Sequence, residues 1–409
     1  MINTDEDARS LLGQRLRLPC GVTLKNRLIK AAMSDSLADG EGNPTEHQIR
    51  LYQRWAEGGA ALALIGEAQT SPHCPEKPGN LVLGPGADFP ALKRLAEQGS
   101  VSGAQIWPQL GHAGALAYSP VSDPKGPSPL QVEGLQCDGL TLEEIEELPH
   151  AYASAATLAR QSGFGGVQIH AGHGFLLSQF LSPLFNKRSD AYGGTVANRF
   201  RLVGEIIGVV RKAVGPDFPI SIKINSTDKL VGGLSDEEAL DVVRLLSETT
   251  VDLIDISGGT YFPGAASSSD GVSVKGPYFA DFARRAKELT STPVMLTGGF
   301  KTRAEALAAI REGYADAVGL ARSMVLEPGL PNNWLSGAAH DPAFPVFKSP
   351  QKGGVTAWYT MRLTALAEEA ELDFNLTAED ALKIYDQRDA QRAALWLKRF
   401  GRASKSSTG

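Results

Sequence analysis

The chain has 409 residues, a formal net charge of −6 at pH 7 and a hydrophobic fraction of 42%. The mildly acidic balance gives no attraction to nucleic acid or to an anionic membrane surface. No apolar run approaches the roughly 18 residues of a membrane span, and the polar N-terminus MINTDEDARS lacks the apolar stretch of a secretory signal. The sequence therefore predicts a cytoplasmic protein without nucleic-acid or membrane partners.

The three cysteines, Cys20, Cys74 and Cys137, lie far apart, and no C-x-x-C pair occurs. Zinc sites, iron–sulfur clusters and disulfide frameworks all need closer or paired cysteines. We therefore predict no metal centre and a reducing compartment.

The first predicted element is a short hairpin. The segment LRLPCGVTLKNR, residues 16–27, has Pro19 and Gly21 near its turn. Because it precedes the first buried strand, we expect it to cover the bottom of the fold.

Short apolar runs alternate with amphipathic stretches from about residue 28 to residue 325, which is typical of repeated β-α units around a parallel sheet. The predicted strands are 28–33, 61–67, 105–110, 166–170, 220–225, 253–257, 294–297 and 317–320. Eight parallel strands close a barrel. The sequence therefore predicts an α/β fold, a (β/α)8 TIM barrel.

Helices are expected between these strands, at 45–57, 88–98, 141–161, 198–214, 235–249 and 302–311. Thr141 with Glu144, and Ser235 with Glu238, have the spacing of capping boxes. The Gly/Pro/Ser-rich stretch 111–140 follows the third strand. In a parallel barrel such a loop lies on the catalytic face.

The β-α rhythm stops after about residue 336. Residues 342–354 are linker-like, and 358–370 and 377–400 have the pattern of helices. We therefore expect a barrel domain over 1–335. A C-terminal helical extension over 336–409 is expected to pack on the barrel or on another subunit of a homo-oligomer.

Two histidines, His170 and His173, directly follow the fourth strand. At the mouth of a barrel, two N–H donors aimed at one oxygen would polarise a carbonyl or nitro group and favour hydride addition to a conjugated carbon. The alternatives are a metal pair or histidines that satisfy loop backbone. The metal alternative is weakened because no acidic residue adjoins the pair in the sequence.

Two further features point to an anionic ligand. Thr297-Gly-Gly-Phe ends the seventh strand and Arg322 follows the eighth, which is where phosphate commonly binds in such barrels. Lys223, within the fifth strand, should point into the barrel, where an unpaired cation is costly. It would face the anionic edge of a reduced flavin, pair with Asp255 or Glu67, or form a Schiff base as in an aldolase.

These motifs together resemble the Old Yellow Enzyme family of NAD(P)H:flavin oxidoreductases, over about residues 10–335. The double histidine is closer to the bacterial and 2,4-dienoyl-CoA-reductase-like branch, although the cluster-binding cysteines of its larger members are absent. The matching motifs are NRLIKAAM (26–33), QLGHAG (109–114), HAGHG (170–174), LSP (181–183), YGG (192–194), NR (198–199), TGGF (297–300) and Arg322.

The resemblance implies FMN at the C-terminal mouth of the barrel, reduced by NADH or NADPH, and a small-molecule substrate. His170 and His173 would hold the electron-withdrawing oxygen of that substrate while flavin N5 delivers hydride to its β-carbon. Gln109 would meet the pyrimidine ring of the flavin, and Lys223 its N1–O2 edge. The remaining implied contacts are Ala31, Ala32, Met33 and Ser34 along one flavin edge, the backbone of Ala68, and Gly299, Ala321 and Arg322 at the phosphate.

One departure from the family affects the chemistry. Many members have a tyrosine that protonates the α-carbon, and here that position is Phe175, which lines the substrate site but has no exchangeable proton. Tyr118, as a substrate contact, and Tyr261, as a catalytic group, are candidate substitutes on mouth loops. The sequence thus predicts reduction of an activated C=C bond in an enone, dienoyl or nitroalkene substrate. The alternative is a flavin-dependent isomerase or a homologue of altered activity. The loops at 111–140 and 260–276 are expected to select the substrate.

Overall fold

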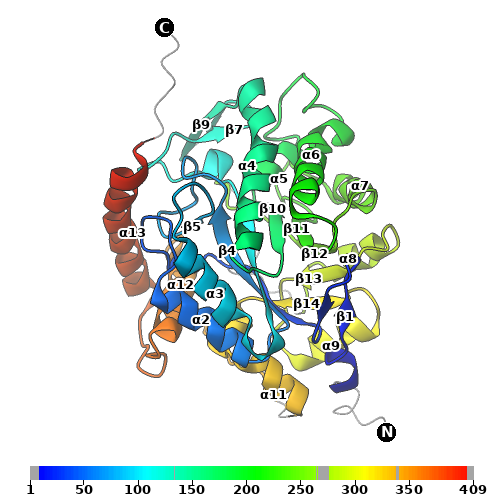
Figure 1. Cartoon of the computed structure of the whole chain (residues 1–409), viewed down its shortest axis with the longest axis vertical. Helices are drawn as coiled ribbons and strands as arrows, with labels where there is room; N and C mark the ends of the chain where they lie inside the picture. Colours follow the sequence, from blue (N-terminus) through cyan, green and yellow to red (C-terminus); the bar gives the residue numbers. More distant parts are fainter. Residues whose placement is uncertain (1–8, 133, 264, 266–275, 338–339, 403–409) are drawn as a thin grey trace.

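Eight parallel strands form a closed barrel at the centre of the computed structural model (Figure 1), which describes residues 9–132, 134–263, 265, 276–337 and 340–402. They follow one another in the ring as β3, β14, β13, β12, β11, β10, β6 and β4, and β3 pairs with β4 to close it. The predicted TIM barrel is confirmed. The strands are β3 (Leu28–Lys30), β4 (Leu62–Gln69), β6 (Gln105–Gly111), β10 (Val167–Ala171), β11 (Ile220–Asn225), β12 (Leu253–Ser257), β13 (Val294–Thr297) and β14 (Ala317–Leu320).

Two strands differ from their predicted bounds by more than one residue at an end, and both differences have local reasons. The first ends at Lys30 rather than at residue 33, because the chain then leaves the ladder and keeps only an isolated bridge from Ser34 to Gly66. The second continues to Gln69, since the short strand β5 (Leu81–Val82) pairs with its last two residues.

Helices surround the barrel, and several of them begin at residues whose side chains cap the first turn. Capping boxes are present at Thr141, Ser235 and Thr302, each with the glutamate three residues later. Such a box satisfies two otherwise unpaired N–H groups of the first turn. The helices are α2 (Glu46–Glu57), α3 (Phe89–Gly99), α4 (Leu142–Gln161), α5 (Leu176–Leu181), α6 (Val196–Val214), α7 (Asp236–Ser247), α8 (Ala280–Lys287), α9 (Arg303–Arg311), α10 (Arg322–Leu326), α11 (Leu330–Ser336), α12 (Gly354–Ala367) and α13 (Ala378–Phe400).

The barrel interior is apolar at the start of the strands and polar near their ends. Leu62, Trp107, Leu253 and Met295 pack together with leucines of the N-terminal hairpin, β1 (Leu16–Arg17) and β2 (Thr23–Leu24). The hairpin therefore closes the bottom of the barrel, as expected. The polar side chains of Gln109, Lys223 and Asp255 lie further along their strands, toward the mouth.

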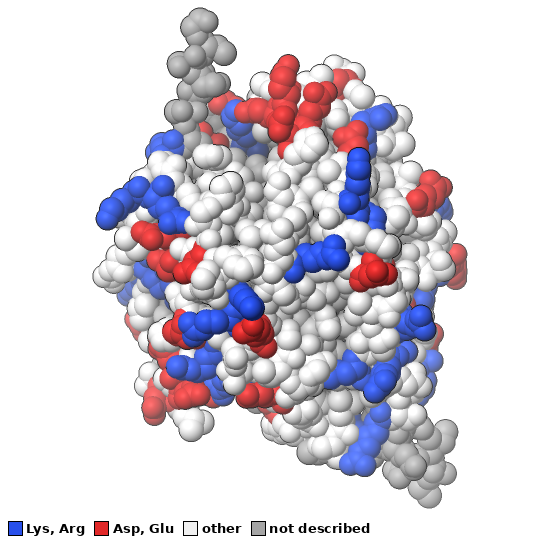
Figure 2. All heavy atoms as spheres, viewed as in Figure 1, with Lys and Arg blue, Asp and Glu red and all other residues white. Residues whose placement is uncertain are grey.

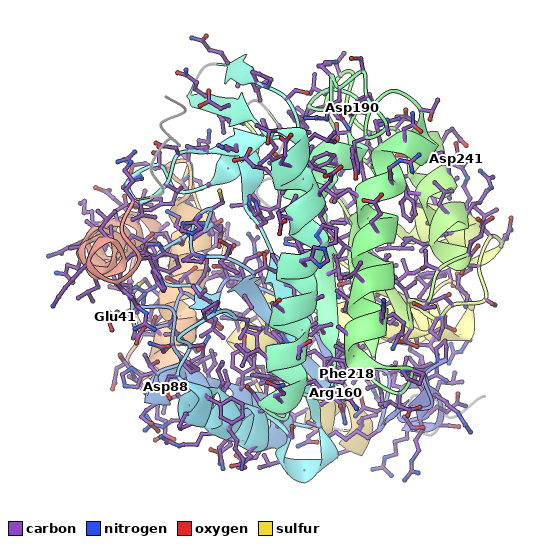
Figure 3. The ribbon with its side chains drawn as sticks, turned by 45° about the horizontal axis from the view of Figure 1, so that its top comes forward. Glu41, Asp88, Arg160, Asp190, Phe218 and Asp241 are labelled. Carbon is purple, nitrogen blue, oxygen red and sulfur yellow. The ribbon has the colours of Figure 1, made fainter. Side chains whose placement is uncertain are left out.

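The loops at the mouth carry structure that the sequence pattern did not predict. The stretch 111–140 contains a 3₁₀ turn, Gly114–Leu116, and a small sheet of β7 (Lys125–Gly126), β8 (Leu130–Val132) and β9 (Leu135–Gly139). In Figure 3, Asp190 and Asp241 lie toward the mouth, whereas Arg160 and Phe218 lie toward the bottom. Residues 264 and 266–275, within the second predicted substrate loop, lie outside the described residues.

The two C-terminal helices lie against the barrel and its mouth loops, with α13 along one side of the molecule (Figure 1). The indole of Trp396 is fully buried and donates to the carbonyl of Pro72 at 3.2 Å. Arg392 donates to the carbonyl of Ser36 at 2.6 Å. Thus α13 contacts the loops that follow both β3 and β4.

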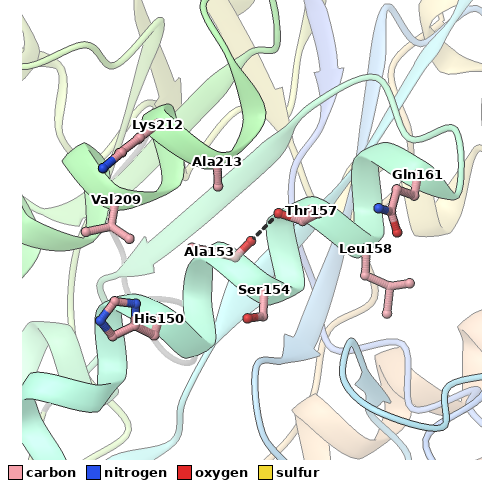
Figure 4. Close-up of a pocket in the computed structure, with 9 residues that line it drawn as sticks. All are labelled: His150, Ala153, Ser154, Thr157, Leu158, Gln161, Val209, Lys212 and Ala213. Atoms are coloured by element: carbon pink, nitrogen blue, oxygen red, sulfur yellow. Dashed lines mark hydrogen bonds between the residues drawn. The ribbon is translucent and has the colours of Figure 1, made fainter.

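The outer surface has mixed charge. Acidic and basic side chains are interspersed on the face drawn in Figure 2. An open hollow between α4 and α6, lined by His150, Thr157 and Lys212 among others, lies on the outside of the barrel (Figure 4). Among the described residues, no helix is long and apolar enough to cross a membrane.

The contacts of α13 with the mouth loops predict that substitution of Trp396, which is far from the histidines, changes the stability of the protein. Trp396→Ala should lower the free energy of unfolding by about 3–5 kcal/mol, because it leaves a cavity under the helix. Trp396→Phe should cost about 1–2 kcal/mol, mainly the lost hydrogen bond to Pro72. Leu372→Ala is the control, since this side chain is 96% exposed. Denaturant unfolding measures all three, and an unchanged Trp396→Ala would contradict the docked position of α13.

Candidate active site at the barrel mouth

His170 and His173 lie together at the mouth. His170 is at the end of β10, in register with Lys223 of β11. His173 has a left-handed backbone (φ 60°), and its N–H donates to Oδ1 of Asn225 at 2.8 Å. A short bridge to Thr260 fixes the same residue from the other side. The loop after β10 is therefore held between two neighbouring strands, which orients the second imidazole.

The two imidazoles form the middle of a chain of four groups. Nδ1 of His170 lies against the carboxylate of Glu67. Nε2 of His170 is 2.9 Å from Nδ1 of His173, and Nε2 of His173 is 3.0 Å from the hydroxyl of Ser257. The sequence predicted that both rings would present N–H groups to one external oxygen. In the structure the rings contact each other, and three of the four ring nitrogens have a hydrogen-bond partner within the protein. The fourth, Nδ1 of His170, lies against the Glu67 carboxylate without a hydrogen bond in this geometry.

Burial controls the charge state of this chain. It raises the pKa of Glu67 to about 8, opposed by the ammonium of Lys223. Burial also holds the pKa of His170 well below its usual range, with a further lowering by Lys223. The pKa of His173 is lowered well below its usual range by burial first and then by His170 and Lys223. At neutral pH both imidazoles are therefore neutral, and each carries one N–H.

Glu67 is the site residue that the sequence reasoning missed. The sequence suggests Glu67 only as a partner for Lys223, and it places no acidic residue beside the histidine pair. Because Glu67 lies on β4 and His170 on β10, they meet only when β6 places these strands around the closed ring. The available signal was an acidic residue at the end of an otherwise apolar strand. Among the described residues, no group of three or more metal-ligating side chains is suited to hold an ion.

A second polar network fills the barrel below the histidines. Asp255 accepts from Thr297 at 2.6 Å and from Gln168 at 3.2 Å, and Lys223 lies 3.1 Å from it. Gln168 in turn accepts from Gln109 at 2.6 Å. Of the alternatives for Lys223, the ion pair with Asp255 is therefore present.

The segment after β3 lies against β4 at a glycine. A Cβ on Gly66 would meet the Cβ of Ala32 at 3.0 Å, the N of Met33 at 3.1 Å and Oε1 of Gln109 at 3.2 Å. This close approach brings the two strand ends and the Gln109 amide together. Ala31 and Ala68 are fully buried behind this segment, whereas Ala32, Met33 and Ser34 are partly accessible.

The hydroxyl of Ser34 is already engaged. It donates to the carboxylate of Glu76 at 2.8 Å and accepts from the amide of Asn80 at 3.2 Å. The pKa of Glu76 is raised to about 7, mainly by burial and then by the charge of Glu67. A ligand that needs a hydrogen bond donated by Ser34 must therefore compete with Glu76 for that hydroxyl group.

The ends of β13 and β14 form the other side of the mouth. Gly298 and Gly299 have φ values of 119° and 87°, a backbone region that other residues rarely adopt. Ala321 caps the short helix α10, which begins at Arg322. The guanidinium of Arg322 lies 4.7 Å from the ring centroid of Tyr359 on α12. The C-terminal extension thus contacts this part of the mouth.

Of the three aromatic residues expected near the histidine pair, two lie beside it and one lies elsewhere. Phe175 is buried, and its ring centroid is 5.0 Å from that of His170 and 5.8 Å from that of Tyr261. Tyr261 is 63% exposed, and its ring is 6.1 Å from that of His173. Tyr118 instead lies under the ammonium of Lys77 and packs with residues of α13. Of the two tyrosines, Tyr261 is the one in contact with the histidine pair.

Comparison with known proteins identifies this arrangement. Residues 19–340 match the model of the NADH:flavin oxidoreductase / NADH oxidase family. The chain is 33% identical over 361 residues to the NADH-dependent flavin oxidoreductase iliE of Hypocrea jecorina, covering 77% of this chain and 86% of that protein. It is 34% identical over 356 residues to iliE of a Neonectria species, covering 78% of this chain but only 46% of that protein.

Among solved structures, the old yellow enzyme homologue from Zymomonas mobilis is 25% identical with a TM-score of 0.70, covering 83% of this chain and 95% of that one. The fold and the family match over most of the barrel therefore agree. The chain belongs to the NADH:flavin oxidoreductase / NADH oxidase family, as its resemblance to the Old Yellow Enzymes implied.

Proposed function

We propose that this protein uses FMN to pass a hydride from NADH or NADPH to an activated C=C bond, in an enone-, dienoyl- or nitroalkene-like substrate. The observation that carries the proposal is the placement of His170 and His173 above a polar network that contains Gln109 and Lys223. The electron-withdrawing oxygen of a substrate needs N–H donors, which the two imidazoles can supply. A flavin ring needs polar partners at its edge, which Gln109 and Lys223 can supply.

The residues at the mouth fit FMN by their chemistry. Gln109 has both a donor and an acceptor for a pyrimidine edge, and Lys223 has a cation for the edge that becomes anionic on reduction. The glycine-dependent cradle at Gly66 leaves Ala32, Met33 and Ser34 accessible beside Gln109. The backbone N–H of Ala68 would complete this side.

The phosphate of FMN would be held at the other end of the mouth. Left-handed Gly299 leaves its N–H free of a Cβ that would block close approach, and Ala321 is likewise a backbone contact. Arg322 supplies a fork of donors for the phosphate oxygens. The aromatic face of Tyr359 supports that guanidinium.

Bound flavin supplies the hydride, and the protein supplies position and charge. The histidine pair would hold the substrate oxygen, with Phe175 and Tyr261 forming the adjacent wall. Negative charge that develops on that oxygen would be stabilised by an imidazole N–H in a largely water-excluded site.

The first prediction concerns the cofactor. The purified full-length protein should show flavin absorbance, and NADH or NADPH should bleach it under anaerobic conditions. Enones, dienoyl thioesters and nitroalkenes should then restore the colour, which stopped-flow absorbance measures. Lys223→Arg should retain this behaviour, whereas Lys223→Gln should bind FMN at least about tenfold more weakly because Asp255 loses its counter-charge. A colourless protein that takes up no added FMN would disprove the proposal.

The second prediction concerns Phe175. Phe175→Tyr restores a phenolic proton beside the histidine pair, and flavin reoxidation by a simple enone should accelerate by about 10²–10⁴-fold if protonation limits the natural protein. Tyr261→Phe tests the competing donor. No acceleration in the first variant, together with loss of reoxidation in the second, would assign the proton to Tyr261.

A second candidate function rests on the same observation. The ring of Phe175 places carbon, not a hydroxyl, against His170. Without a rapid proton donor, a reduced substrate can return its hydride, and the net reaction becomes isomerisation. Product analysis with a substrate that has an isomerisable double bond separates the two functions.

A further inference from the structure

With both imidazoles neutral, the contacts among Glu67, His170, His173 and Ser257 are compatible with two arrangements of their protons, once the Glu67 carboxyl group turns to form a hydrogen bond with the adjacent Nδ1 of His170. With Glu67 protonated, its hydroxyl donates to Nδ1 of His170, Nε2–H of His170 donates to His173, and Nε2–H of His173 points to Ser257. With Glu67 ionised, every hydrogen bond is reversed, and the hydroxyl of Ser257 donates to a bare Nε2 of His173. Any other arrangement sets two donors or two acceptors face to face in a buried site, which is costly.

We propose that Glu67, His170, His173 and Ser257 form a proton relay in which the state of Glu67 decides whether His173 offers an N–H or a lone pair to the substrate oxygen. This inference rests on the proposed function. It makes Glu67 a positioning residue that acts through His170. The protonated state is the competent one, because only then can the outer nitrogen of His173 donate.

The strand next to Glu67 leaves space for its carboxyl group. A Cβ on Gly111 would lie 1.9 Å from Oε2 of Glu67, so the adjacent strand β6 leaves room only by having glycine. The side chain is 5% exposed.

The ionisable groups that act on Glu67 come from several elements. Lys223 on β11 favours the ionised form of Glu67. Glu76 after β4 is near enough for the charge of Glu67 to raise its pKa. His170 on β10 is the contacting group, and Tyr152 on α4 is close enough for its own pKa to be raised by Glu67. Burial, the largest effect, favours the protonated form.

The relay also supplies the proton that Phe175 cannot. Hydride addition to the β-carbon forms a C–H bond and moves the electron pair of the C=C bond toward the substrate oxygen, giving an enolate. That oxygen takes the proton from Nε2 of His173, His173 recovers one at Nδ1 from His170, and His170 recovers one from Glu67. The products are an enol and the Glu67 carboxylate, which regains its proton from solvent. The enol then becomes the ketone by exchange with water.

Imidazole tautomers provide the direct test. The full-length protein, labelled with ¹⁵N-histidine, should show both ring tautomers exchanging together between about pH 6 and pH 10, with His170→Asn and His173→Asn used for assignment. Glu67→Gln should abolish this step. Glu76→Gln is the matched control, because it removes a neighbouring buried acid outside the relay and should only shift the step. A step that survives Glu67→Gln, or that is absent from the natural protein, would overturn the relay.

If the Glu67→Gln variant fails to fold, a second measurement on the natural protein still tests the relay. In the natural protein, infrared titration should show loss of a protonated carboxyl signal at the same pH as the tautomer exchange. Loss of that signal at a clearly different pH would overturn the proposal. Neither measurement requires bound flavin, so failure of the relay is distinguished from failure of the proposed function.

Stability provides a further prediction. The pKa of folded Glu67, about 8, is above the ordinary value of 4.5. The stabilisation by its proton is therefore complete below about pH 4.5 and is lost as the pH rises through about 8. Denaturant unfolding should show the natural protein losing stability relative to Glu67→Gln over this range. A constant difference would contradict the burial of Glu67.

The reaction itself gives the last test. Flavin reoxidation by an enone should fall about tenfold per pH unit above the tautomer step, and Glu67→Gln should remove that pH dependence. With an α-methyl enone in D₂O, the natural protein should give α-deuterated product without facial preference, whereas Phe175→Tyr should favour one face. Product of a single configuration from the natural protein would overturn proton delivery to oxygen.

Discussion

The polar upper half of the barrel depends on one buried carboxylate, Asp255. A closed barrel has no solvent inside, so each polar side chain that points inward must find its partner on another strand. Asp255 accepts from Thr297 and Gln168 and balances Lys223, which together tie β10, β11, β12 and β13 to one another. Gln109 joins through Gln168. The side chains best suited to meet a flavin are therefore held by the same network that makes their burial tolerable.

The histidine pair lies closer to the mouth than Asp255, and its buried polar groups likewise need partners on other segments. The two rings bond to each other, Ser257 engages Nε2 of His173, and the Glu67 carboxylate lies against Nδ1 of His170. A site that is complete in itself can bind a substrate oxygen only by exchanging one internal hydrogen bond for an external one. The cost of that exchange is small when the new acceptor gains negative charge, as happens during reduction. Affinity for the reacting state is thereby favoured over affinity for the resting substrate.

The C-terminal extension contributes to the mouth from outside the barrel. Helix α13 holds the loops after β3 and β4 through Arg392 and Trp396, and α12 places Tyr359 on Arg322. Both ends of the proposed cofactor site therefore contact this segment. Loops carry function only when a rigid neighbour fixes them, and these two helices have that role here.

The sequence by itself determined the barrel, its strands and most helices, because apolar periodicity and capping residues act over a few neighbouring positions. It also located Gln109 and the histidines near strand ends and Lys223 inside the barrel, and the order of motifs indicated the family. Only the tertiary structure decided which partners these groups have: Asp255 for Lys223, Glu76 for Ser34, Tyr359 for Arg322 and Glu67 for His170. These pairs join distant segments, and local pattern carries no information about which strands become neighbours when the ring closes.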